Sequence, residues 1–289
     1  MIAAVAAIVI DGTLNRARAQ VCAANLTNRA DVQLATPGND YNVHFDMNAM
    51  SADAYPVANA GFVRDALFNS HHVFVNTNGF RNPNFSANPN DTCISMAVGC
   101  FADAPLDRIR LQSGCMAGLA EPFTRSVVNH ELFHHTQYAY INFGDWPSWG
   151  TWTIEATPSA MEDRSFADVD NNANNSRFVG DVNGYLGTPN TTLMMRSYDA
   201  ALFWNYIAEQ FGAVRTEPNM GVDIIRGFWE RCRGNSPDSV RFVRETIDAA
   251  APGRTLENVY IDMAIANFTH NLTLTALTAA QRARYSYID

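Results

Sequence analysis

The stretch NHELFHHTQYAY, residues 129–140, contains the side chains that are best suited to bind a metal and to catalyse a reaction. His130 and His134 are four positions apart, so on an α-helix they lie about 40° apart around the axis and one turn from each other. Two imidazoles placed in this way can bind one Zn²⁺ ion. Glu131 lies beside them and can take a proton from the attacking water and pass it to a leaving amine. The motif therefore indicates a zinc site that activates water, with a chance pair of histidines on an ordinary helix as the alternative.

A catalytic zinc ion needs a third protein ligand and one open position. Glu155, in the segment WTIEAT, is 21 positions after His134 and opens the next expected helix. A helix–loop–helix of this length can fold back and bring Glu155 beside the two histidines. Asp145 is a nearer acid, but it falls in the intervening loop. Glu162 shares a helical face with Glu155, so it either holds a ligand imidazole through its second N–H or is an ordinary surface carboxylate.

The remaining histidines give no second site from their positions alone. His135 points about 100° away from its neighbour on the helix, so we expect it beside the site or at the surface rather than on the metal. His71 and His72 are adjacent near the end of another expected helix, which suits a cap or a surface position. His44 and His270 have no evident partner in the sequence.

The chain resembles the gluzincin metallopeptidases, which include thermolysin and the alanyl-aminopeptidase family. The resemblance rests on HELFH, WTIEATPSAMED and SYDAALFWNYIAEQFG, and it covers about residues 125–215. Along its whole length the chain looks more like secreted bacterial metalloproteases of this group than like either named enzyme. Three features differ from the aminopeptidases: Ala156 replaces a glycine, the gap from His134 to Glu155 is slightly longer, and no G-x-M-E-N segment is present. The last difference argues against a standard aminopeptidase.

This resemblance implies a role for each matching position. The zinc ligands would be His130, His134 and Glu155, and Glu131 would be the general base and then the general acid. Tyr198 would donate a hydrogen bond to the oxyanion, although a tyrosine is also an ordinary residue at a helix start. The implied substrate-binding residues, on an edge strand that pairs with an extended peptide, are Arg108, Ile109, Arg110 and Leu111. Alternatively, the two arginines of that strand only form a solvated face.

Composition describes a globular protein without a nucleic-acid partner. Hydrophobic residues make up 47% of the 289 residues, charged residues make up 17%, and the net charge is −9. No segment after the N-terminus approaches 18 uninterrupted apolar residues, so we expect no integral membrane segment. The expected partner is a peptide or protein substrate, and the sequence does not indicate an oligomeric state.

The cysteines and the N-terminus favour an extracytoplasmic protein, either secreted, periplasmic or at the cell surface. Three of the five cysteines lie between residues 93 and 115, which suits a local disulfide in an exported protein, although small buried thiols are the alternative. The apolar run MIAAVAAIVI and the A-x-A segment at residues 17–19 indicate a signal peptide over residues 1–20, with a buried first strand as the alternative.

Periodicity predicts an α+β fold. A hairpin is expected over residues 31–46, a helix over 57–75, strands over 93–101 and 107–114, and the histidine-bearing helix over 121–141. Residues 168–192 are rich in Asn, Asp and Gly and are expected to form a loop. Helices are expected over 153–166, 198–212, 221–233, 238–253 and 256–270. With the resemblance, this order implies a zincin-like mixed α/β lobe at 21–145 and a mainly helical lobe at 146–289 with the third zinc ligand.

The sequence thus predicts zinc-dependent hydrolysis of peptide bonds, with cleavage inside a chain. A non-catalytic zinc-binding surface or interaction module on the same scaffold is the alternative, and another zinc-dependent hydrolysis is a third reading, because a fold does not determine its substrate.

Overall fold

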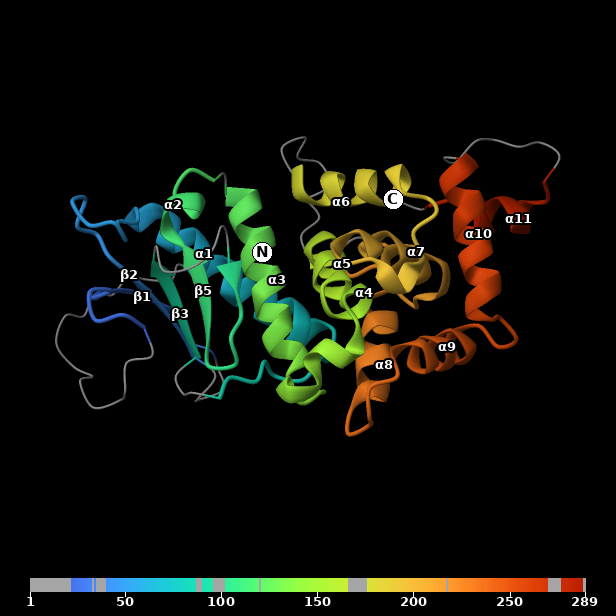
Figure 1. Ribbon diagram of the computed structural model, residues 1–289, viewed down its shortest axis with the longest axis horizontal. Helices are drawn as coiled ribbons and strands as arrows, with labels where there is room; N and C mark the ends of the chain where they lie inside the picture. The colour runs from blue at the N-terminus through green and yellow to red at the C-terminus, as the bar shows by residue number, and fades with distance from the viewer. Residues whose placement is uncertain are drawn as a thin grey trace. The chain divides into compact units, whose positions relative to one another are not determined.

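The structure, a computed structural model, describes residues 22–32, 34, 40–86, 90–95, 102–119, 121–165, 176–216, 218–269 and 277–287. The predicted signal peptide therefore lies outside the described residues. The chain divides into two compact units: unit 1 comprises residues 1–72 and 82–136, and unit 2 comprises residues 73–81 and 137–289. In the described part of the chain the strands all belong to unit 1, while unit 2 is helical, which confirms the α+β prediction (Figure 1).

Unit 1 is built on a five-stranded mixed sheet with the strand order β1-β2-β3-β5-β4. The first two strands pair antiparallel, with Asn28 opposite Phe45 and Val32 opposite Tyr41, so the predicted hairpin is confirmed. Parallel pairing then joins β2 to β3 and β3 to β5, and β4 pairs antiparallel with β5. The strands are β1 (Asn28–Val32), β2 (Tyr41–Phe45), β3 (Asn90–Ser95), β4 (Ala102–Asp103) and β5 (Arg108–Gln112).

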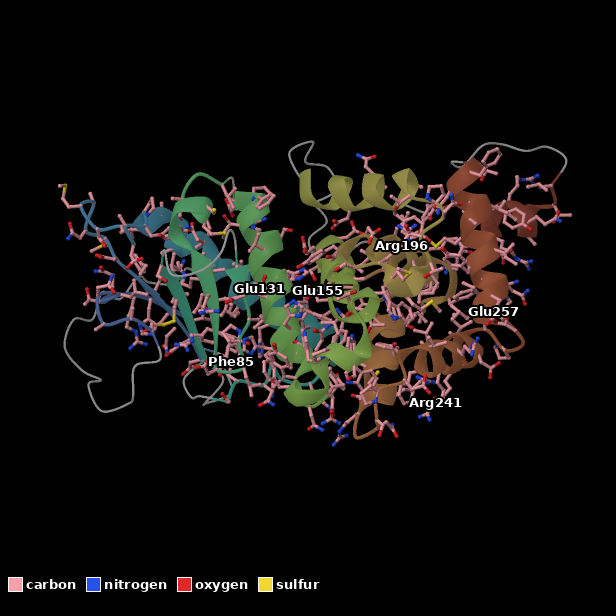
Figure 2. All side chains as sticks on the ribbon, viewed as in Figure 1. Phe85, Glu131, Glu155, Arg196, Arg241 and Glu257 are labelled. Atoms are coloured by element: carbon pink, nitrogen blue, oxygen red, sulfur yellow. A yellow bond between two sulfur atoms is a disulfide. The ribbon has the colours of Figure 1, made fainter. Side chains whose placement is uncertain are left out.

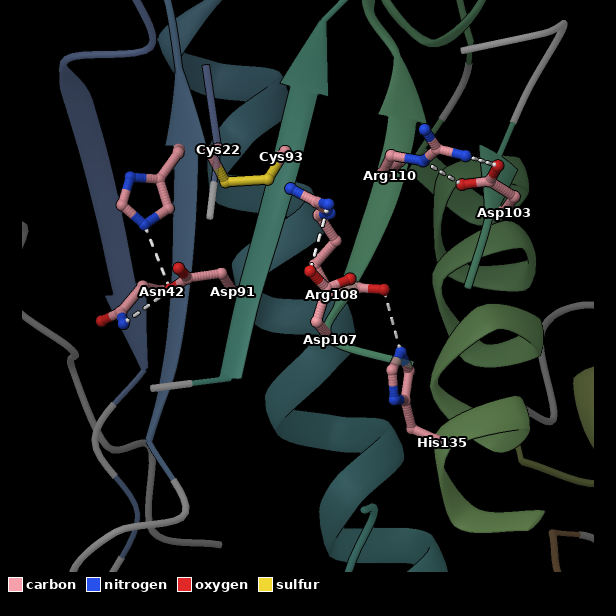
Figure 3. The surroundings of a disulfide bond; sticks show 10 residues. Cys22, Asn42, Asp91, Cys93, Asp103, Asp107, Arg108, Arg110 and His135 are labelled. Carbon is pink, nitrogen blue, oxygen red and sulfur yellow. Dashed lines mark hydrogen bonds and ion pairs between the residues drawn. A yellow bond between two sulfur atoms is a disulfide. The ribbon is translucent and has the colours of Figure 1, made fainter. Parts of the chain in front are cut away.

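Burial follows the position of each strand in the sheet. Every residue of β2 and β3 is buried, as expected for central strands covered on both faces. In β5 only Ile109 and Leu111 are buried, which matches the alternation read from the sequence. A disulfide between Cys22 and Cys93 ties the segment before β1 to β3 (Figure 3). Cys93 therefore pairs across 71 residues rather than locally, and Cys115 is disulfide-bonded as well.

Three helices complete unit 1 up to its boundary: α1 (Val57–His71), the short α2 (Ser113–Met116) and α3 (Glu121–Gln137). The first of these packs on β1 and β2. It continues into a π-helical turn, η1 (His72–Thr77). His71 is buried and its Nδ1 lies 2.8 Å from the Tyr41 hydroxyl, so the predicted surface position of this histidine is wrong.

Unit 2 has an aromatic core formed by its successive helices. Trp204 donates a hydrogen bond to the carbonyl of Trp152 at 2.9 Å, and its ring packs edge-on against Phe228. Its elements are η2 (Phe143–Trp149), α4 (Thr151–Ile154), α5 (Ala156–Ser165), α6 (Ser176–Gly187), η3 (Leu193–Met195), η4 (Tyr198–Ala200), α7 (Ala201–Phe211), α8 (Val222–Cys232), α9 (Ser239–Ala250), α10 (Leu256–Thr269) and α11 (Ala279–Arg284). In the described part of the chain, no helix combines the length and apolar character needed to cross a membrane.

Helix α6 corrects the prediction of a loop over residues 168–192. It contains three glycines, which are poor helix formers, so local propensity gave no signal for it. The helix packs on η4 and α7, and Gly184 would bring an added Cβ to 3.8 Å from the Cβ of Asp199. Tertiary packing against η4 therefore outweighs the low helix propensity of the three glycines in α6.

Candidate metal centre

Helix α3 holds the two histidines on a buried scaffold. Its apolar residues Val127, Val128, Leu132 and Phe133 are fully buried. His130 and His134 are 1% and 6% exposed, and their ring centroids are 4.8 Å apart with the planes at 82°. The imidazoles thus lie one turn apart on the same face of the helix, as the four-residue spacing predicts. Glu131 is also buried on this helix (Figure 2).

Glu155 lies at the junction of α4 and α5. Its backbone is helical, its N–H donates to Thr151 O at 2.9 Å, and its carbonyl accepts from Ser159 N at 3.2 Å. Gln137, the last residue of α3, donates through Nε2 to Ile154 O at 2.9 Å and to Thr157 Oγ1 at 3.0 Å. Gln137 follows His134 by three residues. Its side chain thus contacts the backbone before Glu155 and the Thr157 side chain after it. The spacing of acids and histidines gave no signal for this glutamine.

His130, His134 and Glu155 form a group positioned to bind a metal ion. One ligand atom from each residue can be chosen so that all three lie within 4.8 Å of one another. Ligands of a tetrahedral ion at 2.0–2.2 Å are separated by about 3.4 Å, so this grouping is compact enough after small rotamer adjustments. Two imidazole nitrogens and one carboxylate also suit a first-row divalent ion. The donor set fits the predicted third ligand and leaves the loop acid Asp145 outside the group.

Comparisons with protein-family models and with curated proteins find no match for this chain. The argument for its chemistry therefore rests on the residues and on their geometry.

Two acids that lie within ten residues of Glu155 in the sequence, Glu162 and Asp145, differ in their burial. Glu162 is 1% exposed on α5, so the alternative of an ordinary surface carboxylate is wrong. A buried carboxylate needs hydrogen-bond partners or a nearby cation. A ligand imidazole would be such a partner for Glu162, and this contact stays a prediction. Asp145 is half-buried in η2 and accepts a hydrogen bond from Asn142 Nδ2 at 3.2 Å. This contact gives the loop acid a local role within its turn.

Tyr198 begins η4, and its side chain is 40% exposed. The turn contacts α4 and α5, the two helices that meet at Glu155. The residue thus lies at the start of a helical segment, as predicted, and on a turn that packs against the segment bearing the third ligand. Its role as an oxyanion donor stays a prediction.

Strand β5 is not the edge strand that the sequence analysis expected. Strand β4 lies outside it and pairs Ala102 with Leu111 and Asp103 with Arg110. Next to this pairing, Arg108 N donates to Pro105 O at 3.1 Å, and Arg108 O lies 3.0 Å from His135 Nε2 (Figure 3). These backbone groups therefore already have partners within the chain, so a peptide cannot pair with β5 in the predicted way. The short β4 has no sequence signal because only two residues form it.

His135 packs inside unit 1, where it connects α3 with the rest of that unit. It is fully buried, it stacks on Phe85 with ring centroids 3.6 Å apart, and Nδ1 lies 3.2 Å from Asn84 O. Burial lowers the pKa of His135 to about 3, so the ring is neutral near neutral pH. The predicted exposed position is wrong, and the ring joins α3 to β5 through Arg108 O.

A second group of potential ligand atoms comprises Cys22, His44 and Asp91. The Cys22 sulfur is part of the disulfide, and a metal binds the thiolate rather than a disulfide sulfur. His44 Nε2 lies 3.2 Å from Asp91 Oδ1, so this histidine has a partner that the sequence did not reveal. We therefore interpret this cluster as structural, with a disulfide and with a His–Asp contact between neighbouring strands, and not as a metal site.

Proposed function

We propose that this protein is a zinc-dependent hydrolase that cleaves peptide bonds inside a chain. The observation that carries the proposal is the grouping of His130, His134 and Glu155 beside the buried Glu131. Two histidines and a glutamate are a donor set found in hydrolytic zinc sites, where the fourth position stays open. A bound Zn²⁺ would polarise the scissile carbonyl and lower the pKa of water at the site.

The chain's own residues would carry the proton transfers. Glu131 follows His130 directly in α3, so its carboxylate accepts the proton of the attacking water and returns it to the leaving amine. Tyr198, at the start of η4, donates a hydrogen bond to the oxyanion. The absence of a G-x-M-E-N segment, which anchors a substrate amine in the aminopeptidases that the chain resembles, favours cleavage within a chain.

We further propose that the protein works outside the cytoplasm, in a secreted, periplasmic or cell-surface setting. The disulfide between Cys22 and Cys93 supports this placement, because such bonds persist in oxidising compartments. The bonded Cys115 adds to the same argument.

The test is cleavage of a diverse peptide mixture by zinc-loaded protein, read by mass spectrometry. Glu131→Gln should retain zinc and lose about 10²- to 10⁴-fold in turnover, because the amide cannot accept the proton. Glu121→Gln is the matched control: the same change on the same helix, at a first-turn residue that forms an ion pair with Arg125. It should cut like the wild type.

The cut positions separate cleavage within chains from trimming at their ends. Turnover of Glu131→Gln near the wild-type level would refute the role of Glu131. Stoichiometric zinc without any cut by the wild type would instead support the non-catalytic zinc-binding module.

A further inference from the structure

We infer that Arg196 and Asp199 are positioning residues that hold the turn carrying Tyr198. The inference rests on the proposed hydrolase function and deepens it. All its contacts lie within unit 2.

Asp199 closes the turn on both sides of Tyr198. Its Oδ1 accepts a hydrogen bond from Ser197 N at 3.0 Å, and its Oδ2 accepts one from Arg196 NH1 at 2.6 Å. A three-residue 3₁₀ turn such as η4 has too few internal hydrogen bonds to fix itself. The carboxylate therefore restrains the backbone immediately before the tyrosine.

Arg196 attaches this turn to helix α6. Its side chain is fully buried, and NH2 donates to Thr188 O at 2.7 Å, while NH1 lies 3.3 Å from Thr188 Oγ1. The guanidinium carbon also lies 3.7 Å from the centre of the Tyr185 ring. Figure 2 labels Arg196 among the side chains of the helical unit. Arg196, two positions before Tyr198, thus connects the chain before the tyrosine to the end of α6.

The same turn is joined to the segment that bears Glu155. Thr151, the first residue of α4, donates its hydroxyl proton to Arg196 O at 2.8 Å. Glu155 follows Thr151 by four positions, and its N–H donates to Thr151 O. Arg196 therefore links the tyrosine turn, through its side chain, to the first residue of the helix that ends at Glu155, through its carbonyl.

Burial of the Arg196 guanidinium is costly unless its hydrogen bonds are needed, since an apolar side chain of equal volume can stabilise a core as well or better. An apolar side chain, however, could not bind Thr188 O and Asp199 together. An oxyanion donor must lie within about 2.7–3.1 Å of the developing charge, and a displacement of about 1 Å costs on the order of 100-fold in rate. These requirements explain a buried arginine whose two terminal nitrogens bind Asp199 and Thr188, two positions before the tyrosine.

The test is a double-mutant cycle on kcat and KM with the zinc-loaded protein. Tyr198→Phe should lower kcat about 100-fold or more. Asp199→Asn and Arg196→Met should each lower kcat about 10- to 100-fold, with KM and zinc stoichiometry nearly unchanged. Combined with Tyr198→Phe, Asp199→Asn should cause no further loss, because it acts through the missing hydroxyl. Asp262→Asn, which breaks the Arg254–Asp262 pair elsewhere in unit 2, is the control and should leave kcat unchanged.

A second readout needs no activity. Amide hydrogen exchange over residues 197–201 should rise in metal-free Asp199→Asn, because Ser197 N loses its acceptor. If the two substitutions lower kcat independently, so that their losses multiply in the double mutant, the positioning role is overturned. Unchanged amide exchange in Asp199→Asn would overturn it as well. In either case an active wild type keeps the hydrolase proposal. A wild type that cuts no peptide overturns the hydrolase proposal and this inference with it.

Discussion

At the scale of single residues, the three candidate ligands are held to different degrees. His130 and His134 are buried on one continuous helix, whereas Glu155 is half-buried at a junction between two helices. Two imidazoles one turn apart require only a helix with histidines four positions apart, so the pair alone does not define a catalytic site. The carboxylate is the residue whose position turns a pair of histidines into a three-ligand set.

Glu155→Gln should therefore weaken metal binding strongly. An amide oxygen is a neutral and poorer donor, and the loss of even an indirect partner of a metal ligand costs about 10- to 100-fold in affinity. We expect a loss of at least about 100-fold, measured by competition with a chromophoric zinc chelator. Asp145→Asn is the matched control and should bind zinc like the wild type. An equal loss of zinc affinity in both variants would contradict the assignment of Glu155 as the third ligand.

The sequence located those residues whose chemistry is tied to spacing. The four-residue interval of the histidines requires only that the segment be helical, and Glu155 follows from the need for a third donor. Gln137 and Arg196 could not be found in this way. Each acts by donating to backbone carbonyls in another element, Ile154 O and Thr188 O, and such contacts depend on tertiary packing rather than on any local pattern.

At the scale of elements, α3 and α6 represent two extremes of sequence prediction. The apolar residues of α3 recur at helical spacing, so the histidine-bearing helix was predicted with the correct start, although it ends at Gln137 rather than at residue 141. Helix α6 has three glycines and forms because it packs on η4 and α7. Strand β5 was also predicted, but its place in the sheet was not, because strand order depends on pairings between distant segments.

The contact of Gln137 with the segment that bears Glu155, both within unit 2, can be tested by mutation. Gln137→Leu keeps the shape of the side chain and leaves Ile154 O without this donor, which should cost about 1–3 kcal/mol in the free energy of unfolding. Zinc affinity should fall as well, because the backbone beside Glu155 loses its restraint. Denaturant unfolding and the chelator competition measure the two effects.

Gln210→Leu is the control for this experiment. Gln210 also donates to backbone carbonyls within unit 2, those of Ala283 and Ser286, away from the ligand residues. It should lower stability without changing zinc affinity. Zinc affinity that stays at the wild-type level in Gln137→Leu would show that α4 and α5 hold Glu155 without help.

At the scale of the whole molecule, the free energy of unfolding depends on a buried titratable group and on a disulfide. In unit 1, burial lowers the pKa of His71 to about 4, with a smaller contribution from the charge of His72. In the unfolded chain the same group titrates near 6.5. Between these values the unfolded chain binds more protons than the folded one, so stability falls as pH decreases from about 6.5 to about 4 and His71 causes no further loss below that range.

His71→Gln should make this pH dependence shallower. The amide can still accept a hydrogen bond from Tyr41 but does not titrate. The difference in slope between wild type and variant should be on the order of 1 kcal/mol per pH unit at its steepest. Denaturant unfolding of the metal-free protein from pH 4 to 7 measures it. Parallel curves for the two proteins would mean that other groups cause the acid sensitivity.

The disulfide between Cys22 and Cys93 should contribute to stability without contributing to the metal site. It closes a loop with a sequence separation of 71 residues, for which the loss of chain entropy in the unfolded state corresponds to about 4 kcal/mol. The double variant Cys22→Ser with Cys93→Ser should lose stability of this order and retain the wild-type zinc affinity. Cys232→Ala, which replaces the buried free thiol, controls for the loss of a buried sulfur. An equal loss in that variant would mean that packing, rather than the cross-link, accounts for the effect.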